Sequence, residues 1–364
     1  MEKSYSQTVF LSYHSIRFIS WSLGPLAAIG NIFVIVSLIR SGRRGQGFLC
    51  RRNRKCHMVN IRNSPALLVL LHLAIADLGS SLYFCVMSIA DLLSICHGYS
   101  IFYYDNDTDL SNLEHYSIII NNSTANQTAI LKDTWMLSHL CSTARFFSQI
   151  GIGCANIFAF FITLRRYLTL FHPMRCQQLN MKRTKLFIGL AWSISLFFTL
   201  AITFGSVVLQ KSANVSITQF NIVLNLCQPV TIDYVLYLSA IEVMMNTFLS
   251  LGSITLYIAI SYKMWTKLQR TITDLLYRTQ QRIHIMLACI VLTNAVIFLP
   301  LTCFMIGAMA TPPDLNDLDD ISLYWPIAAL LSYSNCLIDP LLFISLSFAH
   351  LYQRSFRSRR IIRP

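Results

Sequence analysis

Four polar side chains that could bind a cation or carry a proton interrupt apolar stretches of this chain of 364 residues: Asn31, Asp77, Asn335 and Asp339. A carboxyl or amide group surrounded by hydrocarbon is costly without a partner, so each of them is a candidate functional residue. If the four face one another around water, they could hold a sodium ion, with Asp77 as a ligand, or a proton. The alternative is that they serve only as contacts between helices.

These side chains lie in apolar stretches that are long enough to cross a membrane as helices. Seven such stretches can be read along the chain: 18–39, 66–90, 146–164, 186–210, 234–262, 283–310 and 321–346. The only acids inside them are Asp77, Glu242 and Asp339.

The composition supports the membrane interpretation. Hydrophobic residues make up 54% of the chain and charged residues only 12%, against roughly 25% charged residues in soluble domains. A soluble helical bundle would show a polar face at every turn, whereas 18–39 contains no charge. We therefore predict an all-α membrane protein built as a bundle of seven transmembrane helices.

The distribution of basic residues predicts the orientation. Of the 29 Lys and Arg residues, 24 fall in the segments 40–62, 165–185 and 263–282 and after His350, all on one side of the predicted bundle. Basic loops stay in the cytoplasm, so the N-terminal tail 1–17 is expected outside and the C-terminus inside. The net charge of +13 then indicates contact with anionic membrane lipid and does not indicate a nucleic-acid partner.

Glycosylation motifs support this orientation, because all of them fall in predicted outer loops. Their asparagines are Asn106, Asn121, Asn122, Asn126 and Asn214. The first four lie in 93–138, a polar stretch without clear helical periodicity that we expect to be a glycosylated insertion, disordered in part. A multi-pass glycoprotein of the plasma membrane follows, with domain limits 1–17, 18–346 and 347–364.

Most of the eleven cysteines lie within the membrane, but two that stand on the predicted outer side, which is oxidising, are placed differently. Cys141 lies at the outer end of the third predicted helix, and Cys227 lies in the loop before the fifth. We predict a disulfide between them that ties this loop over the mouth of the bundle.

Several motifs, in order along the chain, resemble those of the rhodopsin-like G-protein-coupled receptors, and the resemblance covers 18–358. The matching residues are Gly30-Asn31 with Val34, Leu73 to Asp77, Arg166-Tyr167, His172-Pro173, Trp192, Pro300, Asp339-Pro340 with Phe343, and the short amphipathic segment Phe348 to Phe356. The resemblance implies a seven-helix receptor with a short C-terminal helix on the membrane surface.

The resemblance also implies a mechanism. An extracellular ligand would shift helix six outward about Pro300, and Arg166 and Tyr167 would contact a heterotrimeric G protein in the cavity that opens. The transmitting residues would be Asn31, Asp77, Phe298, Pro300, Asn335, Asp339, Pro340 and Phe343.

The chain departs from the family pattern at positions that affect this mechanism. Arg165 replaces the acid that usually precedes the arginine, and Gln280 stands where an acid on helix six commonly restrains it. Phe298 and Phe343 replace a tryptophan and a tyrosine, and helix five lacks its usual proline. We expect a weakly restrained inactive state.

The outer half of the bundle is expected to bind the ligand. Ser148 and Tyr333 occupy positions where amine receptors and opsins carry their characteristic Asp and Lys, which argues against both classes. The mouth instead presents Arg145, Ser148, Gln149, Glu242 and Tyr333, with an acidic rim at Asp314, Asp317, Asp319 and Asp320. Such a rim would attract a basic peptide, although it could equally be a solvated loop.

Two other classes of function remain as alternatives. A receptor-like protein that traffics or scavenges its ligand without coupling is compatible with Arg165, Gln280 and Phe343. A transporter or channel would show repeats and interrupted helices, which we do not find. No catalytic motif stands out, so neither an enzyme nor a cofactor other than a possible sodium ion is expected.

Overall fold

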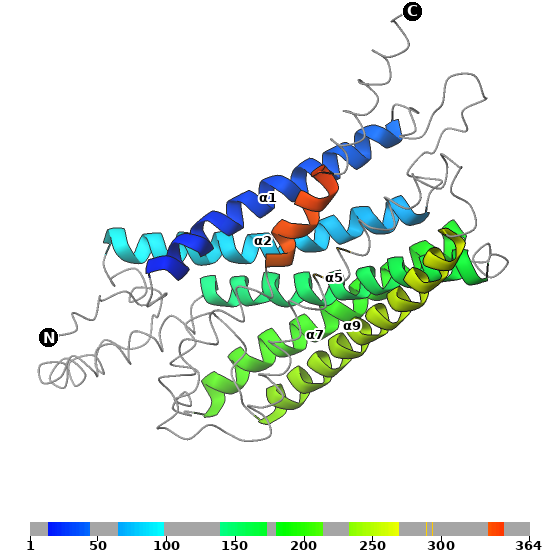
Figure 1. Cartoon of the computed structure of the whole chain (residues 1–364). Coiled ribbons are helices and arrows are strands. Elements are labelled where there is room, and N and C mark those ends of the chain that lie inside the picture. Colours follow the sequence, from blue (N-terminus) through cyan, green and yellow to red (C-terminus); the bar gives the residue numbers. More distant parts are fainter. Residues whose placement is uncertain are drawn as a thin grey trace, which may run out of the picture.

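The structure, a computed structural model, describes residues 14–43, 65–97, 139–172, 180–213, 233–268 and 334–345, with the single positions 289 and 293. These ranges are helical except for their two non-helical end residues, His172 and Asn180. The long helices are α1 (His14–Arg43), α2 (Pro65–His97), α5 (His139–Phe171), α7 (Met181–Ala213) and α9 (Asp233–Leu268). Figure 1 shows them side by side, with α2 and α5 in the middle.

Each long helix contains an apolar stretch that could span a membrane. These stretches are Phe18–Arg40, Pro65–Leu92, Leu140–Phe171, Met181–Gly205 and Ile241–Thr266. They confirm the first five membrane spans predicted from the sequence. A shorter apolar helix, Ser334–Ser345, lies within the predicted seventh span. Most of 283–310, the rest of 321–346 and the predicted surface helix 348–356 lie outside the described residues.

The helices are longer than the apolar stretches that predicted them. α2 continues to His97, so the start of the expected loop 93–138 is helical. α1 begins at His14, inside the expected tail 1–17. The prediction followed hydropathy, whereas helical hydrogen bonding continues through the less apolar residues that flank each apolar stretch.

Local sequence explains how two of these helices begin. Pro65 is the first residue of α2, where its fixed φ suits the helix and its missing N–H costs nothing. Asn180 caps α7, because its side-chain oxygen accepts a hydrogen bond of 3.1 Å from the backbone N–H of Arg183.

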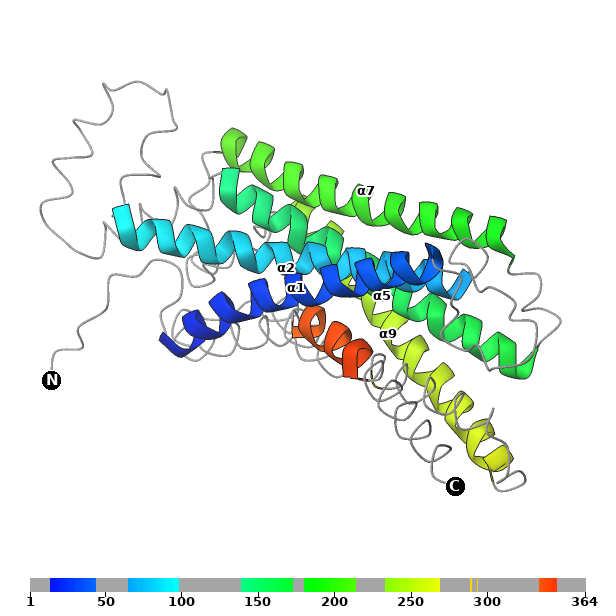
Figure 2. The ribbon, with the colours of Figure 1, turned by 90° about the horizontal axis from the view of Figure 1, so that it is seen from above.

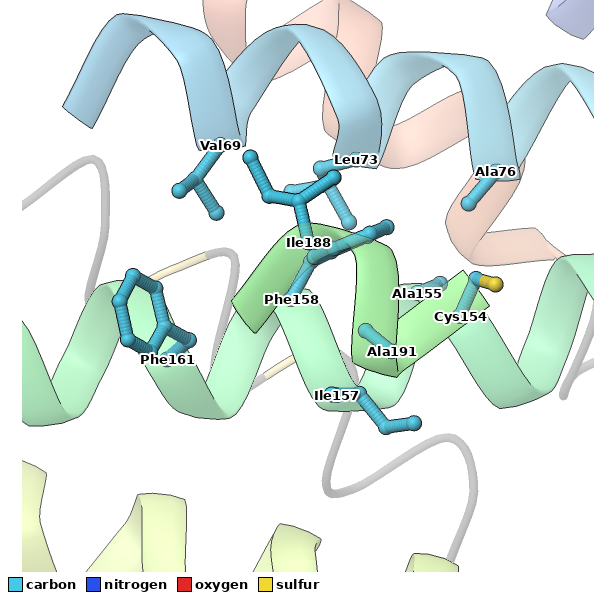
Figure 3. Packing of buried hydrophobic residues seen from close by; sticks show 10 residues of the cluster. All are labelled: Val69, Leu73, Ala76, Cys154, Ala155, Ile157, Phe158, Phe161, Ile188 and Ala191. Atoms are coloured by element: carbon cyan, nitrogen blue, oxygen red, sulfur yellow. The ribbon is translucent and has the colours of Figure 1, made fainter. Parts of the chain in front are cut away.

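The apolar core lies where α2, α5 and α7 meet. Figure 3 shows Val69, Leu73 and Ala76 of α2 and Ile188 and Ala191 of α7 around the α5 residues Cys154, Ala155, Ile157, Phe158 and Phe161. The rings of Phe161 and Phe187 stack with centroids 4.0 Å apart. α5 therefore forms the centre of the described bundle.

Small residues let α2 and α5 approach closely. A Cβ atom added at Gly151 would meet the side-chain oxygen of Ser80 and would lie 2.6 Å from the Ser80 nitrogen and 3.0 Å from the Ala76 oxygen. Such contact between backbones is typical of membrane helices, whose association depends on tight packing.

The helix 334–345, orange in Figures 1 and 2, lies beside α1 and α2. Phe343 packs against Val34 and Leu38 of α1 and Ala74 of α2. Nearer the other end of α1, the indole nitrogen of Trp21 donates a hydrogen bond of 3.0 Å to the Asp91 carboxylate of α2.

Large apolar side chains point outward from the bundle, as expected for surfaces that contact lipid. Phe197 of α7 is 63% exposed and Phe248 of α9 is 73% exposed. Because a protein in water would not expose such rings along whole helices, these faces support a membrane setting.

Candidate functional site

A buried polar cluster joins α1, α2 and the helix 334–345. The Asn31 side-chain amide donates to the backbone oxygens of Cys336, at 2.7 Å, and Ala27, at 3.0 Å, and lies 3.4 Å from the Ser81 hydroxyl oxygen. Ser81 in turn donates to the backbone oxygen of Asp77 at 2.7 Å. The structure thus brings together residues that are far apart in sequence.

Two acids complete this cluster. Asp77 and Asp339 are both buried, and their carboxyl groups are close enough to interact electrostatically. Asn335, also buried, lies one turn before Asp339 on the same helix. The four polar residues singled out from the sequence are therefore buried together on three helices. That they hold a sodium ion or a proton stays a prediction.

The composition of the cluster suits a small hard cation. Carboxylate, amide and hydroxyl oxygens of Asp77, Asp339, Asn335 and Ser81 are the donor atoms that such an ion takes. Among the residues that the structure describes, no group of three or more His, Cys, Asp or Glu side chains could hold a metal ion. A sodium ion would therefore depend on amide, hydroxyl or water oxygens as well as the two acids.

A second polar group lies toward the start of α5, where ligand contacts were predicted. The Gln149 side-chain amide, with its nitrogen turned toward α9, lies 2.9 Å and 3.0 Å from the two oxygens of the Glu242 carboxylate. Glu242 is buried, as are Ser148 and Arg145, the last of which is fully enclosed. Four of the five predicted ligand-binding residues therefore occupy the same part of the bundle.

Polar contacts continue along the interface between α5 and α9. The Asn156 amide nitrogen donates to the Asn246 side-chain oxygen at 3.2 Å, and both residues are buried. Sequence reasoning missed this pair because it considered mainly charged residues and family motifs. The signal was present, since both amides interrupt apolar stretches.

At the other end of this interface lie the residues predicted to contact a G protein. Arg166 interacts electrostatically with Tyr257, a buried residue of α9. The ring of Tyr167 stacks on Phe171 with centroids 4.5 Å apart. The sequence singled out neither Tyr257 nor Phe171.

Lys263 joins the ends of the two helices. Its ammonium nitrogen donates to the backbone oxygen of Leu170 at 2.7 Å and lies 3.9 Å from the centroid of the Phe171 ring. Carbonyl groups in the last turn of a helix lack partners within the helix, so a cation is favourable there. The ammonium group thus fastens α9 to the last turn of α5.

Arg165 is half-buried near these contacts. Within the described ranges its Nη1 atom is enclosed and has no hydrogen-bond partner. The position where the family usually carries an acid therefore adds a second cation directly before Arg166 in the sequence.

Trp192, the lone tryptophan predicted in helix four, contacts a histidine that the sequence did not single out. Its indole nitrogen donates to Nδ1 of His72 at 3.2 Å, and the Phe158 ring lies 6.0 Å from each of their two rings. This contact ties α7 to α2.

Several predicted site residues lie outside the described residues. These are Tyr333, Phe298, Pro300, Gln280, Cys227, Asn106, Asn121, Asn122, Asn126, Asn214 and the acidic rim. Cys141 is buried in the first turn of α5 and is disulfide-bonded. Its pairing with Cys227 stays a prediction.

The described helices therefore carry polar groups at both ends of α5. A separate buried polar cluster joins α1, α2 and the helix 334–345. A family model described as 7 transmembrane receptor (rhodopsin family) matches residues 116–343. No curated protein matches the chain.

Proposed function

Because the chain belongs to the rhodopsin family of seven-transmembrane receptors, we propose that it binds an extracellular ligand and activates a heterotrimeric G protein. The fold proposed with this function has seven transmembrane helices, an extracellular N-terminus and a short surface helix after the seventh. The receptor resides in the plasma membrane, where its basic inner loops contact anionic lipid.

One observation carries the proposal: the polar groups on α5 fall at its two ends and are linked through α9. Gln149 and Glu242 lie at the ligand end, and Arg166 and Tyr257 lie at the G-protein end. A ligand that favours one arrangement of these helices at the first end changes the population of arrangements at the second.

A peptide is the proposed ligand. The expected mouth carries Arg145, Ser148, Gln149 and Glu242 together with Tyr333 and an acidic rim, so it offers several polar contacts and a field that attracts a basic peptide. Amine receptors carry an aspartate at the position of Ser148, and a serine there argues against an amine as the ligand.

The buried cluster of Asp77, Asp339, Asn31 and Asn335 is proposed as the transmitting region. A sodium ion held by Asp77 and neighbouring oxygens would offset the cost of the acids while the receptor is inactive. Pro340 and Phe343, on the same helix as Asp339, and Phe298 and Pro300 in the sixth span would move with it.

A ligand screen tests the function. Cells expressing the chain are exposed to a library of neuropeptides, and calcium and cyclic AMP are read in parallel. We expect a saturable response to at least one basic peptide. The matched variant Arg166→Ala should reach the surface and lose the response, because the proposed contact with the G protein is removed.

Two outcomes would contradict the proposal. If a peptide is bound and internalised without any G-protein signal, the chain is a scavenger receptor. If signalling survives Arg166→Ala unchanged, the proposed coupling site is wrong.

The orientation has a separate test. Changing Asn106, Asn121, Asn122 and Asn126 together to Gln should reduce the mobility shift that an endoglycosidase produces, because translocation would place these sites in the lumen. An unchanged shift would contradict the proposed topology. Peptide mapping without reduction should link Cys141 to Cys227.

A further inference from the structure

Glu242 is a carboxylate enclosed between helices, and no cation among the described residues forms an ion pair with it. Its side chain is 6% exposed, and the Gln149 amide contacts both of its oxygens. A neutral amide satisfies hydrogen bonds but brings no positive charge. No ion pair with another described residue reaches this carboxylate, and an uncompensated buried charge is strongly unfavourable.

The carboxylate lies in the first third of the apolar part of its helix. That apolar stretch runs from 234 to 262, so Glu242 is about two turns inside its first end. Lys263 directly follows the other end, which the basic residues place inside the cell. Glu242 therefore lies in the outer half of the bundle, where the ligand is expected to bind.

The helices around Glu242 offer small side chains on one side. Gly153 lies one turn after Gln149 on α5. A Cβ atom added at Gly153 would lie 3.8 Å from Oε1 of Glu242 and 3.2 Å from the hydroxyl oxygen of Ser195 on α7. The carboxylate thus lies where α5, α7 and α9 converge, and Gln149 fixes its orientation. Its remaining lone pairs can accept further hydrogen bonds.

We propose that Glu242 is the acid that receives a positively charged nitrogen group of the ligand, a protonated amine or a guanidinium group. This inference rests on the proposed function, since it assigns the ligand chemistry of the same site. It places the charge-binding acid on α9, opposite Gln149, while Ser148 on α5 carries no charge. A Lys or Arg side chain or the free N-terminus of a peptide supplies such a group.

A thermal-shift experiment on the purified full-length receptor in lipid nanodiscs tests this assignment without a known ligand. The probes are 2-phenylethylamine, agmatine and arginine amide at millimolar concentration, and 2-phenylethanol serves as the uncharged analogue of the first. At least one cationic probe should raise the unfolding temperature of the native chain, and 2-phenylethanol should not.

Variants then locate the site. Glu242→Gln keeps the shape of the side chain and should weaken the affinity for the active probe by about 30-fold or more, as loss of a buried charge partner does. Glu242→Asp should retain part of the effect. Asp233→Asn, which removes an acid at the start of the same helix, should leave the shift unchanged.

The inference is overturned by a shift that persists in Glu242→Gln, by an equal shift with 2-phenylethanol, or by no shift with any cationic probe. A double-mutant cycle of Glu242→Gln with Arg145→Met gives a further test. Strong coupling in the free receptor would overturn the inference, since Arg145 would then be the internal partner of Glu242. Failure of G-protein coupling would leave the thermal shift intact. A receptor that signals normally with Glu242→Gln would retain the proposed function and lose this inference.

Discussion

The two faces of α5 are built in different ways. Toward α2 and α7 the helix presents apolar side chains and Gly151, whose hydrogen touches the backbone of α2. Toward α9 it presents hydrogen-bonding groups, among them Gln149 and Asn156. The first face is held mainly by close packing, in which a small displacement causes steric overlap. The second face includes separate polar contacts that can break and form again one at a time.

This difference assigns the two faces different tasks. A change between two arrangements of a close-packed face costs much free energy, so α2, α5 and α7 are expected to move as one unit. A face built from polar pairs can exchange partners with a ligand at one end and with a G protein at the other. Variants on each face should therefore affect different observables.

The largest effect is expected from Gly151→Ala on the packed face. The added Cβ would stand 2.6 Å from the Ser80 nitrogen, and overpacking costs about 1 to 3 kcal/mol, here at the upper end because backbone must move. We expect lower surface expression and a lower unfolding temperature. Gly189→Ala is the control, because a Cβ there meets nothing within 4 Å. Equal behaviour of the two variants would show that the packed face is not tight.

Arg165→Asp tests the polar face at its inner end. An acid beside Arg166 could restrain it by about 1 to 3 kcal/mol, so signalling without ligand should fall about tenfold at matched surface expression. Lys182→Asp, an exposed site on α7, makes the same change in net charge and should have little effect. Background signalling by the native chain, or a raised level that Arg165→Asp leaves unchanged, would contradict the prediction.

Lys263→Met should have a smaller effect in the opposite direction. The variant keeps the length of the side chain and removes the ammonium contacts with Leu170 and Phe171. Such contacts contribute about 1 kcal/mol in a partly exposed setting, so basal signalling should rise roughly fivefold. Lys185→Met on α7 serves as the control. Unchanged or reduced basal signalling would mean that these contacts do not restrain the inactive state.

The smallest effect is expected at Asn156 and Asn246. A double-mutant cycle with Asn156→Ala and Asn246→Ala should give a coupling energy of about 0.6 kcal/mol, the average for hydrogen bonds between membrane helices. The cycle of Asn156→Ala with Ser253→Ala should be additive, since the Ser253 hydroxyl bonds to Leu249 of its own helix. Coupling above about 1.7 kcal/mol would place this pair outside the range for such bonds.

Hydropathy alone predicted the five described spans, because the cost of burying backbone and charge in hydrocarbon acts on every residue of a long segment. Helix ends were predicted less well. α2 runs past residue 90, where the predicted span ended, to His97, since helical hydrogen bonding does not stop where apolar character fades. The order of motifs, from Asn31 to Asp339, was also enough to indicate the rhodopsin family, which the family model shows.

The sequence by itself determined that Asp77 and Glu242 need partners, because an ionisable group in hydrocarbon is costly whatever its neighbours are. Only the tertiary structure decided which partners they have. Glu242 faces Gln149, and Arg166 faces Tyr257. The physical reason is that hydrophobicity is summed along one chain, whereas a hydrogen bond depends on the packing and rotation of two helices that meet only in the folded bundle.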